Sequence, residues 1–398
     1  MHAARRRVLI LVENLPVPLD RRVWQEACTL RDAGYDVTVI CPRMRGFTRA
    51  EEVLDGIQIY RHWISGEAKT TAGFLLEYTT ALIGGLVCAL KAWSRHGRFD
   101  IIHLCNPPDL LFLVALPFKL LGGARVLFDA HDLWPEMFEA KFGALGLLYR
   151  AVCLAERCTL ALADVVIATN ESVRAALMRR GRLHDDAVFV VRTAPVNLDT
   201  AAPPDDSLRR GKAHLVGYIG VLGGSDGVDY LLEAAHHLVH TRRRHDIHFL
   251  LMGGGPEFDA LVKKRDQLGL QEHVSMPGLV SDAFLCSALR SIDLGVACDP
   301  INAYNDCCTM NKVLEYMAFA RPMVMFGTVE GRYSAGEAAA YVMENDAAQF
   351  AEAISALLDD PARRAQMGRA GHQRLTTELN WERSAQCLRA AYARCLSS

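Results

Sequence analysis

Long hydrophobic runs are scarce in this chain of 398 residues, although 51% of its residues are hydrophobic. The longest apolar segments, residues 81–90 and 110–118, are too short to cross a bilayer as helices. Residues 5–12 resemble the start of a signal peptide, but the apolar run stops at Glu13 and no cleavage site follows. We therefore expect the first apolar run to form a buried strand.

The chain also lacks an excess of charge: 44 Lys and Arg residues stand against 46 Asp and Glu residues. Proteins that bind the backbone of nucleic acids usually have a strongly basic domain, so nucleic acid is excluded as the principal partner and small molecules are favoured. Residues 73–98 fit contact with a membrane surface, because Lys91, Arg95 and Arg98 follow an apolar helical pattern. An ordinary packed helix with a solvated end is the alternative.

Patterns for metals, disulfides and dinucleotides are missing as well. The 12 cysteines include no Cys-x-x-Cys pair, which indicates reduced thiols in a cytoplasmic protein. Residues 73–98 could still attach such a protein peripherally to the inner face of the membrane. Asp129-x-x-Asp132 is not an Asp-x-Asp metal motif, and no Gly-x-Gly-x-x-Gly fingerprint supports an NAD-type oxidoreductase. We expect no metal and no cofactor.

Apolar strand patterns alternate with longer helical patterns, which predicts parallel sheets with helices on both faces. In the first half, strands are expected near residues 7–12, 36–41, 100–104, 125–129, 165–169 and 187–191, and helices near 20–33, 74–95, 109–121, 135–162 and 171–181. In the second half, strands are expected near residues 214–219, 247–252, 273–276, 293–297, 322–326 and 340–343. Residues 193–212 have no hydrophobic period and read as a linker.

The predicted architecture is therefore α/β, with two doubly wound Rossmann-like domains facing a central cleft. The predicted parts are an N-terminal domain at residues 1–192, the linker at 193–212, a C-terminal domain at 213–380 and a last helix at 381–398. Ligands of open α/β sheets usually bind at the carboxyl ends of the strands, which would line that cleft.

Residues 292–317 combine a short apolar run, a polar loop and a helical pattern that begins near Thr309. The start of a helix attracts anions, and Lys312 in the first turn adds a full positive charge. Glu315 follows three residues later on the same face, so an ammonium for a phosphate and a carboxylate for hydroxyl groups would project together. A solvated pair of Lys312 and Glu315 is the alternative.

The segment from Asn305 to Val324 resembles the donor-binding segment of glycosyltransferase family 4, whose members are retaining sugar transferases with the GT-B fold. In that family a helix carries the second Glu of a Glu-x7-Glu pair, and a strand led by Pro follows. Glu315 and Pro322 match this pattern, whereas Cys307 stands in place of the first Glu. The resemblance implies that a nucleoside diphosphate sugar contacts Asp306, Thr309, Met310, Asn311, Lys312 and Glu315. It also implies that the last helix crosses back to the first domain.

In the first domain, Asp20 is a candidate helix cap, and Arg21 and Arg22 occupy the first turn. Two cations at the positive end of a helix dipole favour a visiting anion, here the donor. Pairing with Glu13 or Glu26 is the alternative. The block Pro-Leu-Asp-Arg-Arg replaces the Gly-rich turn of most family members and resembles the subset that makes exopolysaccharide and O-antigen.

A histidine follows another predicted strand of this domain. His131 with Asp132 resembles the active-site His-Asp of family 4, and such a His can bind a sugar hydroxyl or carry a proton. A purely structural histidine is the alternative.

Two glycine-rich turns follow strands of the second domain and permit close approach of the backbone to a diphosphate or base. The positions expected to contact the donor are Gly223, Gly224, Gly254 and Gly255. Many family members have Arg at the position of Val221 and Lys at that of Asp226, and both basic groups are absent here.

The expected function is a retaining hexosyltransferase that moves a sugar from a UDP- or GDP-type donor to a hydroxyl of a lipid-linked or polysaccharide acceptor. His131, Lys312 and Glu315 are the predicted catalytic residues. The alternative is a subunit that binds nucleotide sugar or serves in assembly but has lost turnover.

Overall fold

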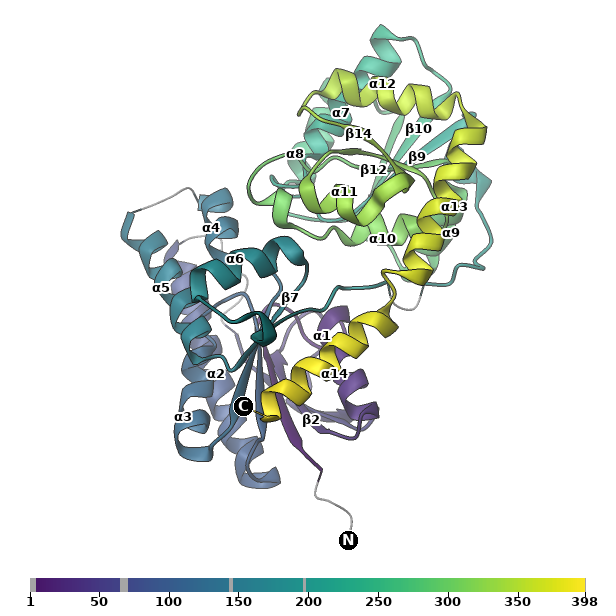
Figure 1. Ribbon diagram of the computed structural model, residues 1–398. Coiled ribbons are helices and arrows are strands. Elements are labelled where there is room, and N and C mark those ends of the chain that lie inside the picture. The colour runs from purple at the N-terminus through teal and green to yellow at the C-terminus, as the bar shows by residue number, and fades with distance from the viewer. Residues whose placement is uncertain (1–4, 65–70, 143–145, 196–197, 398) are drawn as a thin grey trace. The chain divides into compact units, whose positions relative to one another are not determined.

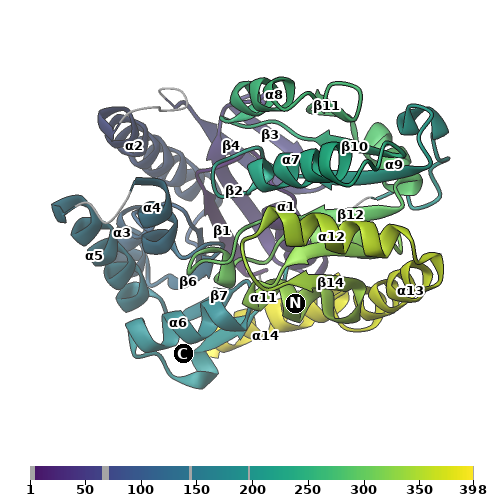
Figure 2. The ribbon, with the colours of Figure 1, turned by 90° about the horizontal axis from the view of Figure 1, so that it is seen from above.

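The structure, a computed structural model, describes residues 5–64, 71–142, 146–195 and 198–397. The chain divides into two compact units (Figure 1), one formed by Met1–Thr193 with Trp381–Ser398 and the other by Ala194–Asn380. Figures 1 and 2 show helices on both faces of each sheet. The predicted α/β fold with two Rossmann-like units is confirmed.

The sheet of the first unit has the strand order β3-β4-β2-β1-β5-β6-β7-β8. Its strands are β1 (Arg7–Val12), β2 (Asp36–Pro42), β3 (Glu51–Leu54), β4 (Ile57–His62), β5 (Ile101–Cys105), β6 (Arg125–Ala130), β7 (Val165–Ala168) and β8 (Val188–Val190). Its helices are α1 (Arg21–Asp32), α2 (Thr71–His96), α3 (Phe112–Gly122), α4 (Trp134–Phe142), α5 (Gly146–Leu162), α6 (Glu171–Gly181) and α14 (Trp381–Ser397). Within the predicted helix at 135–162, residues 143–145 lie outside the described residues.

The hairpin of β3 and β4 is an antiparallel element that sequence reasoning missed. Asp55 and Gly56 form its two-residue turn with φ of 48° and 79°, a conformation that Asp-Gly favours in hairpins. The available signal was this dipeptide between two alternating apolar patterns.

Helix α14, from the end of the chain, completes the core of the first unit. Leu388 and Tyr392 belong to the same buried cluster as the apolar residues of β1 and β2. The Tyr392 hydroxyl lies 2.9 Å from Nδ1 of His103, and Nε1 of Trp381 donates to Oγ1 of Thr29 at 2.9 Å. The predicted return of the last helix to the first domain is confirmed.

The sheet of the second unit has the strand order β11-β10-β9-β12-β13-β14. Its strands are β9 (His214–Ile219), β10 (Ile247–Met252), β11 (Val274–Gly278), β12 (Leu294–Ala297), β13 (Met323–Phe326) and β14 (Ala339–Val342). Its helices are α7 (Val228–His236), α8 (Phe258–Gln267), α9 (Asp282–Ser291), α10 (Asn311–Ala318), α11 (Val329–Ala335), α12 (Ala347–Leu358) and α13 (Pro361–Thr377). Neighbouring residues of β9 enter buried clusters on opposite faces, so this sheet is covered on both sides.

Much of the segment read as a linker packs on the second unit. Ala202 and Leu208 join the core there, and Arg209 pairs with Asp293 at 2.5 Å. Residues 196–197 of that segment lie outside the described residues.

Among the described helices, none combines the length with the apolar composition that a membrane-spanning helix needs.

Candidate active site

The second unit has a switch point between β9 and β12. Strands β9, β10 and β11 follow one another to one side of the sheet, and β12, β13 and β14 to the other. Ligands of open α/β sheets bind at the carboxyl ends of the strands beside such a point. The loop after β9 contains Gly223 and Gly224, and the loop after β12 leads to α10, so this switch point is the candidate donor site.

Lys312 is a buried cation at this switch point, with 7% of its surface exposed. Its ammonium donates to both carboxylate oxygens of Asp299 at 2.9 Å and lies 3.4 Å from the Tyr218 hydroxyl. Burial alone would lower the pKa of Lys312, but Asp299 and the other acidic groups around the ammonium together outweigh burial and raise it. The alternative of a solvated pair with Glu315 is therefore wrong, and contact with a donor phosphate stays a prediction.

Asp226 adds a second carboxylate 3.9 Å from the Lys312 ammonium. Burial raises the pKa of Asp226 to about 6, against the lowering effect of Lys312. Lys312 thus faces two acidic groups, and a phosphate arriving here would meet a cation that is already paired. Sequence reasoning noted Asp226 only as a missing Lys, because nothing local connects it with Asp299.

The turn after β10 packs against the turn after β9. A Cβ on Gly253 would lie 1.8 Å from the Gly220 carbonyl oxygen, and one on Gly255 would lie 2.5 Å from that of Leu222. The Leu222 N–H donates to the Gly254 carbonyl at 3.0 Å. Close approach between two protein backbones therefore requires Gly253 and Gly255, and a role of Gly254 and Gly255 toward the base stays a prediction.

Gly224 differs from the other predicted glycines, because no heavy atom lies within 4 Å of the Cβ it lacks. At Gly223 an added Cβ would lie 2.9 Å from a carboxylate oxygen of Asp226. Gly224 is therefore the predicted glycine whose backbone has open space on that side.

The residues around the missing glutamate tie loops together. Asp306 accepts a hydrogen bond from the backbone N–H of Val329, the first residue of α11, at 3.0 Å. Asn305 is 3% exposed and donates to the carbonyls of Ser225 and Pro300 at 3.1 and 2.9 Å. Asp306 thus supports the start of a helix, and its contact with the donor stays a prediction.

Helix α10 begins two residues after the predicted start at Thr309, with Met310 as its cap residue. Asn311 is exposed and Glu315 is partly exposed, whereas Val313, Leu314 and Met317 are buried. Positions 311 and 315 are four apart, so they share one face of the helix. This face is what α10 offers to a ligand.

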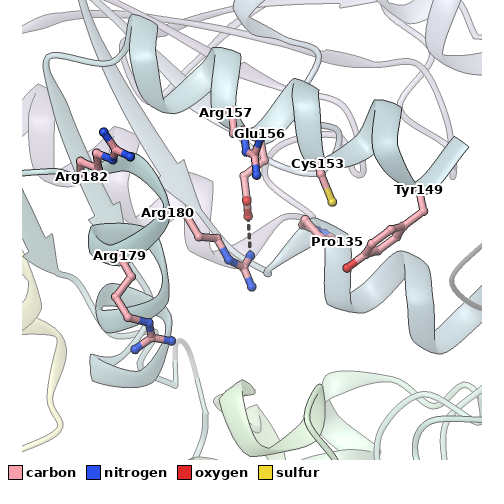
Figure 3. Close-up of a pocket in the computed structure, with 8 residues that line it drawn as sticks. All are labelled: Pro135, Tyr149, Cys153, Glu156, Arg157, Arg179, Arg180 and Arg182. Carbon is pink, nitrogen blue, oxygen red and sulfur yellow. Dashed lines mark hydrogen bonds and ion pairs between the residues drawn. The ribbon is translucent and has the colours of Figure 1, made fainter. Parts of the chain in front are cut away.

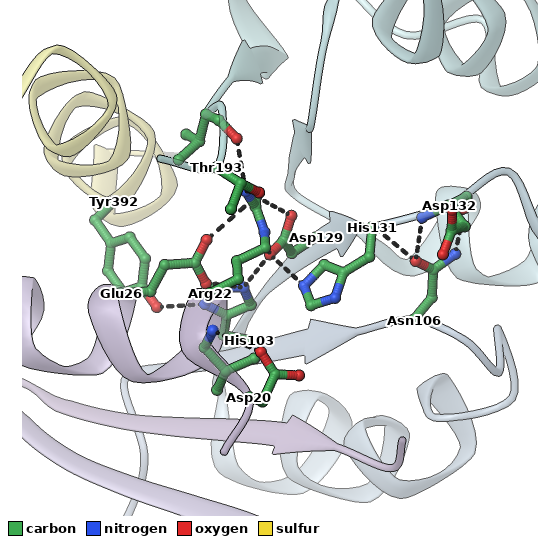
Figure 4. Close-up of polar contacts among 12 residues, drawn as sticks. Asp20, Arg22, Glu26, His103, Asn106, Asp129, His131, Asp132, Thr193 and Tyr392 are labelled. Carbon is green, nitrogen blue, oxygen red and sulfur yellow. Dashed lines mark hydrogen bonds and ion pairs between the residues drawn. The ribbon is translucent and has the colours of Figure 1, made fainter. Parts of the chain in front are cut away.

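The switch point of the first unit lies between β1 and β5, and a buried ion cluster occupies it (Figure 4). Arg22 donates through Nε and Nη2 to the two oxygens of Asp129 at 3.0 and 2.7 Å and through Nη1 to the Val191 carbonyl at 2.7 Å. Glu26 lies 3.2 Å from Nη2. The guanidinium of Arg22 is thus buried and paired inside the unit, which includes the alternative of pairing with Glu26, and its contact with the donor stays a prediction. Arg21 is exposed, and its donor contact stays a prediction.

His131 lies at the edge of this cluster, with 15% of its side chain exposed. Its Nε2 lies 2.8 Å from Oδ2 of Asp129, and its backbone N–H donates to Oδ1 of Asn106 at 2.7 Å. Burial opposes a charge on the imidazole, but Asp129 outweighs burial and raises the pKa of His131. With Nε2 bound to Asp129, Nδ1 is the ring nitrogen left for a ligand.

Sequence reasoning named Glu26 as a possible partner of Arg22 and missed His103 as a member of this cluster. Both are 0% exposed, and Nε2 of His103 lies 3.8 Å from Glu26 and 3.6 Å from Asp129. Burial raises the pKa of Glu26, although Arg22 opposes that shift. Glu26, His103 and Asp129 lie on three separate elements, so no local pattern could join them.

Glu26, His103, Cys105 and Asp129 also offer metal-ligand atoms within 4.8 Å of one another. Arg22, however, already donates to both oxygens of Asp129, and burial raises the pKa of the Cys105 thiol. The geometry therefore fits an ion-pair network better than a cation site.

Two family models match the chain, in order and over most of its length. The first, described as glycosyl transferase 4-like domain, matches residues 19–193, and the second, described as glycosyl transferases group 1, matches residues 213–360. The alpha-D-kanosaminyltransferase of Streptomyces kanamyceticus is 29% identical over 224 residues, which are 54% of this chain and 56% of that relative. The chain thus aligns with little more than half the length of this relative.

Solved structures show the same fold at low identity. Sucrose-phosphate synthase from Thermosynechococcus elongatus has a TM-score of 0.80 at 18% identity, covering 99% of this chain and 100% of that chain. Anabaena HepE in complex with UDP-glucose has a TM-score of 0.70 at 14% identity, covering 97% and 99%. Fold and family matches together define a GT-B glycosyltransferase. The chain belongs to glycosyltransferase family 4.

Proposed function

We propose that the protein is a retaining hexosyltransferase that uses a UDP- or GDP-type sugar and transfers the sugar to a hydroxyl of a lipid-linked or polysaccharide acceptor. The observation that carries this proposal is the second switch point, where Asn305 of the loop after β12 donates to the Ser225 carbonyl of the open Gly224 turn at 3.1 Å. Helix α10 follows that loop and exposes Asn311 and, in part, Glu315. The complex of Anabaena HepE with UDP-glucose supports a donor of this type.

In this proposal Glu315 accepts hydrogen bonds from the ribose, and the first turn of α10 faces the diphosphate. The amides of that turn and the charge of Lys312 offset the negative charge that develops as the diphosphate leaves. The acceptor oxygen bonds to the anomeric carbon as the bond to the diphosphate breaks, and the hydroxyl proton passes to a departing phosphate oxygen. His131 binds a hydroxyl of the donor sugar through Nδ1. It contributes by orienting that sugar and does not act as a nucleophile.

The second candidate function is a subunit that binds nucleotide sugar without turnover. Two features favour this candidate. Cys307 lacks the carboxylate that the family has at this position, and Asp226 adds negative charge near Lys312, which opposes a diphosphate.

A thermal-shift screen against UDP, GDP and ADP identifies the base, and the matching sugars are then incubated with candidate acceptors. Sugar transfer or slow donor hydrolysis supports the enzyme. Tight donor binding with neither product supports the subunit, and no nucleotide binding contradicts both candidates.

Peripheral membrane contact is a further part of this proposal. Helix α2 exposes apolar side chains at helical spacing, and they are Leu76, Ile83, Val87 and Leu90. Lys91 and Arg95 both pair with Glu51. The exposed apolar side chains of α2, more than its charges, would therefore bind the membrane surface. Cosedimentation with phosphatidylglycerol vesicles should persist at high salt and fall in Ile83→Gln/Val87→Gln. Binding that disappears at high salt, or survives in this variant, contradicts an apolar contact.

A further inference from the structure

A cavity of about 550 Å³ lies within the first unit, between the start of α4, the middle of α5 and the end of α6. Figure 3 shows Arg180 pointing into it from α6 and the Tyr149 hydroxyl directed toward the same space from α5. The lining residues are Pro135, Tyr149, Cys153, Glu156, Arg157, Arg179, Arg180 and Arg182. Neither the ion cluster around Asp129 nor the switch point of the second unit supplies any of them.

The charge of this lining is strongly unbalanced, with four arginines against one glutamate. Arg180 is neutralised, because it pairs with Glu136 and donates to Glu156 at 2.8 Å. Among the described residues, no ion pair involves Arg157, Arg179 or Arg182, although the Glu156 carboxylate interacts electrostatically with Arg157. The guanidiniums of Arg179 and Arg182 therefore line the cavity without a counter-charge from this part of the chain.

A helix dipole explains only some of these arginines. Arg179 and Arg180 lie in the last turn of α6, where cations are favoured by the negative end of the dipole. Arg157 lies in α5 outside its last turn, so the dipole does not account for it. Arginines from two helices around one cavity are the arrangement expected for an oxyanion with several acceptor oxygens, such as phosphate.

Exposed leucines on α5 narrow the class of ligand that the cavity would bind. Leu147, Leu148 and Leu154 of α5 are 83%, 41% and 61% exposed, on the helix that also supplies Tyr149 and Arg157. A cationic cavity on a helix that also exposes leucines suits a molecule with a phosphate head and an apolar chain.

We propose that this cavity binds the phosphate or diphosphate group of the sugar acceptor, an inference that rests on the proposed transferase function. The phosphate is the shared chemistry of two sources, a lipid-linked diphosphate and a water-soluble sugar phosphate. The guanidiniums hold the phosphate oxygens, and the exposed leucines contact a lipid chain where one is present.

The test uses the full chain saturated with the nucleoside diphosphate that the thermal-shift screen selects, so that the donor site is filled. Inorganic pyrophosphate and farnesyl diphosphate are titrated by calorimetry into the wild type, into Arg179→Gln/Arg182→Gln and into the control Arg98→Gln. Arg98 is an exposed arginine of the same unit outside the cavity. We expect the double variant to bind both probes at least about tenfold more weakly, since each lost charged hydrogen bond is worth about one decade or more. The control should bind as the wild type does.

Farnesyl diphosphate binding more tightly than pyrophosphate supports a lipid-linked source, and equal binding supports a soluble one. Unchanged thermal unfolding of the variant shows that its fold is intact. Pyrophosphate that does not bind, or that binds equally well to the double variant, overturns the inference.

In transfer assays, the double variant should raise KM for a phosphorylated acceptor and leave KM for the donor unchanged. Normal transfer with no change in acceptor KM contradicts this cavity while the transferase function stands. Failure to bind any nucleotide sugar contradicts the proposed function instead, and the pyrophosphate titration still decides the cavity.

Discussion

Each unit places a buried cation at the switch point of its sheet, and the two units use that cation differently. In the first unit, Arg22 binds Asp129 and lies beside Glu26, and its guanidinium is committed to the protein. In the second unit, Lys312 binds Asp299 and lies 3.9 Å from Asp226, next to the open Gly224 turn. The first arrangement locks β6 to α1, whereas the second leaves backbone space for a ligand.

Each cluster also contains one carboxylate more than its cation balances. Burial raises the pKa of Glu26 in the first unit and raises that of Asp226 to about 6 in the second. Glu26 is 0% exposed, but the side chain of Asp226 is 19% exposed. A sealed cluster therefore acts on stability, and a partly open one can also respond to a ligand and to pH.

The largest expected effect comes from breaking the sealed cluster. Arg22→Met should lower the free energy of unfolding by about 4 kcal/mol, because Asp129 and Glu26 lose their buried counter-charge. Chemical denaturation measures this loss. Arg21→Met, at an exposed position one residue earlier, should change it by less than about 0.5 kcal/mol. Equal effects of the two variants would show that the buried cluster carries no special stability.

Breaking the buried ion pair of the second unit should lower the free energy of unfolding by a smaller amount. Lys312→Met is expected to lower the free energy of unfolding by about 3 kcal/mol, since Asp299 stays buried without its partner. Adding Asp299→Asn should recover part of the loss, because the unpaired charge is removed. A double variant no more stable than the single one would contradict pairing of Lys312 with Asp299.

A variant of a residue that contacts the donor should show more clearly how the second unit differs from the first. Glu315→Gln should weaken binding of the preferred nucleotide sugar by about 1 to 3 kcal/mol, the value of a charge-assisted hydrogen bond, and leave the unfolding midpoint unchanged. Calorimetric titration gives the affinity. Glu344→Gln, an exposed acidic position of the same unit, is the control. Unchanged donor affinity in Glu315→Gln would remove α10 from the donor site.

The smallest effect concerns pH. The pKa of Asp226 is about 6 in the folded state against 3.8 as the ordinary value, so the folded state binds more protons between these pH values. Its contribution to the free energy of unfolding is therefore full below about pH 4 and is lost as pH rises through 6. Asp226→Asn should remove about 1 to 2 kcal/mol of this decline between pH 4 and 7. Denaturation series at several pH values measure it, and parallel curves for both proteins would contradict the raised pKa.

Sequence reasoning located most elements of both sheets because their signals are local. Asp20 and Asp360 accept hydrogen bonds from the N–H groups of Val23 and Arg363, as expected of helix caps. The family resemblance likewise rests on a short continuous segment around Glu315, whose contact with the donor stays a prediction. For Arg22 the sequence left a visiting anion and an internal carboxylate open, because the choice depends on Asp129, a distant residue in the sequence.

The amino-acid sequence by itself determined the alternation of strands and helices, the helix caps and the family, because backbone hydrogen bonding and side-chain period act over a few neighbouring residues. Only the tertiary structure decided which carboxylates pair with Arg22 and Lys312 and that arginines from α5 and α6 surround one cavity. The order of strands in a sheet decides which strand ends, and the side chains that follow them, become neighbours. Charges then interact across distances in space that local sequence does not encode.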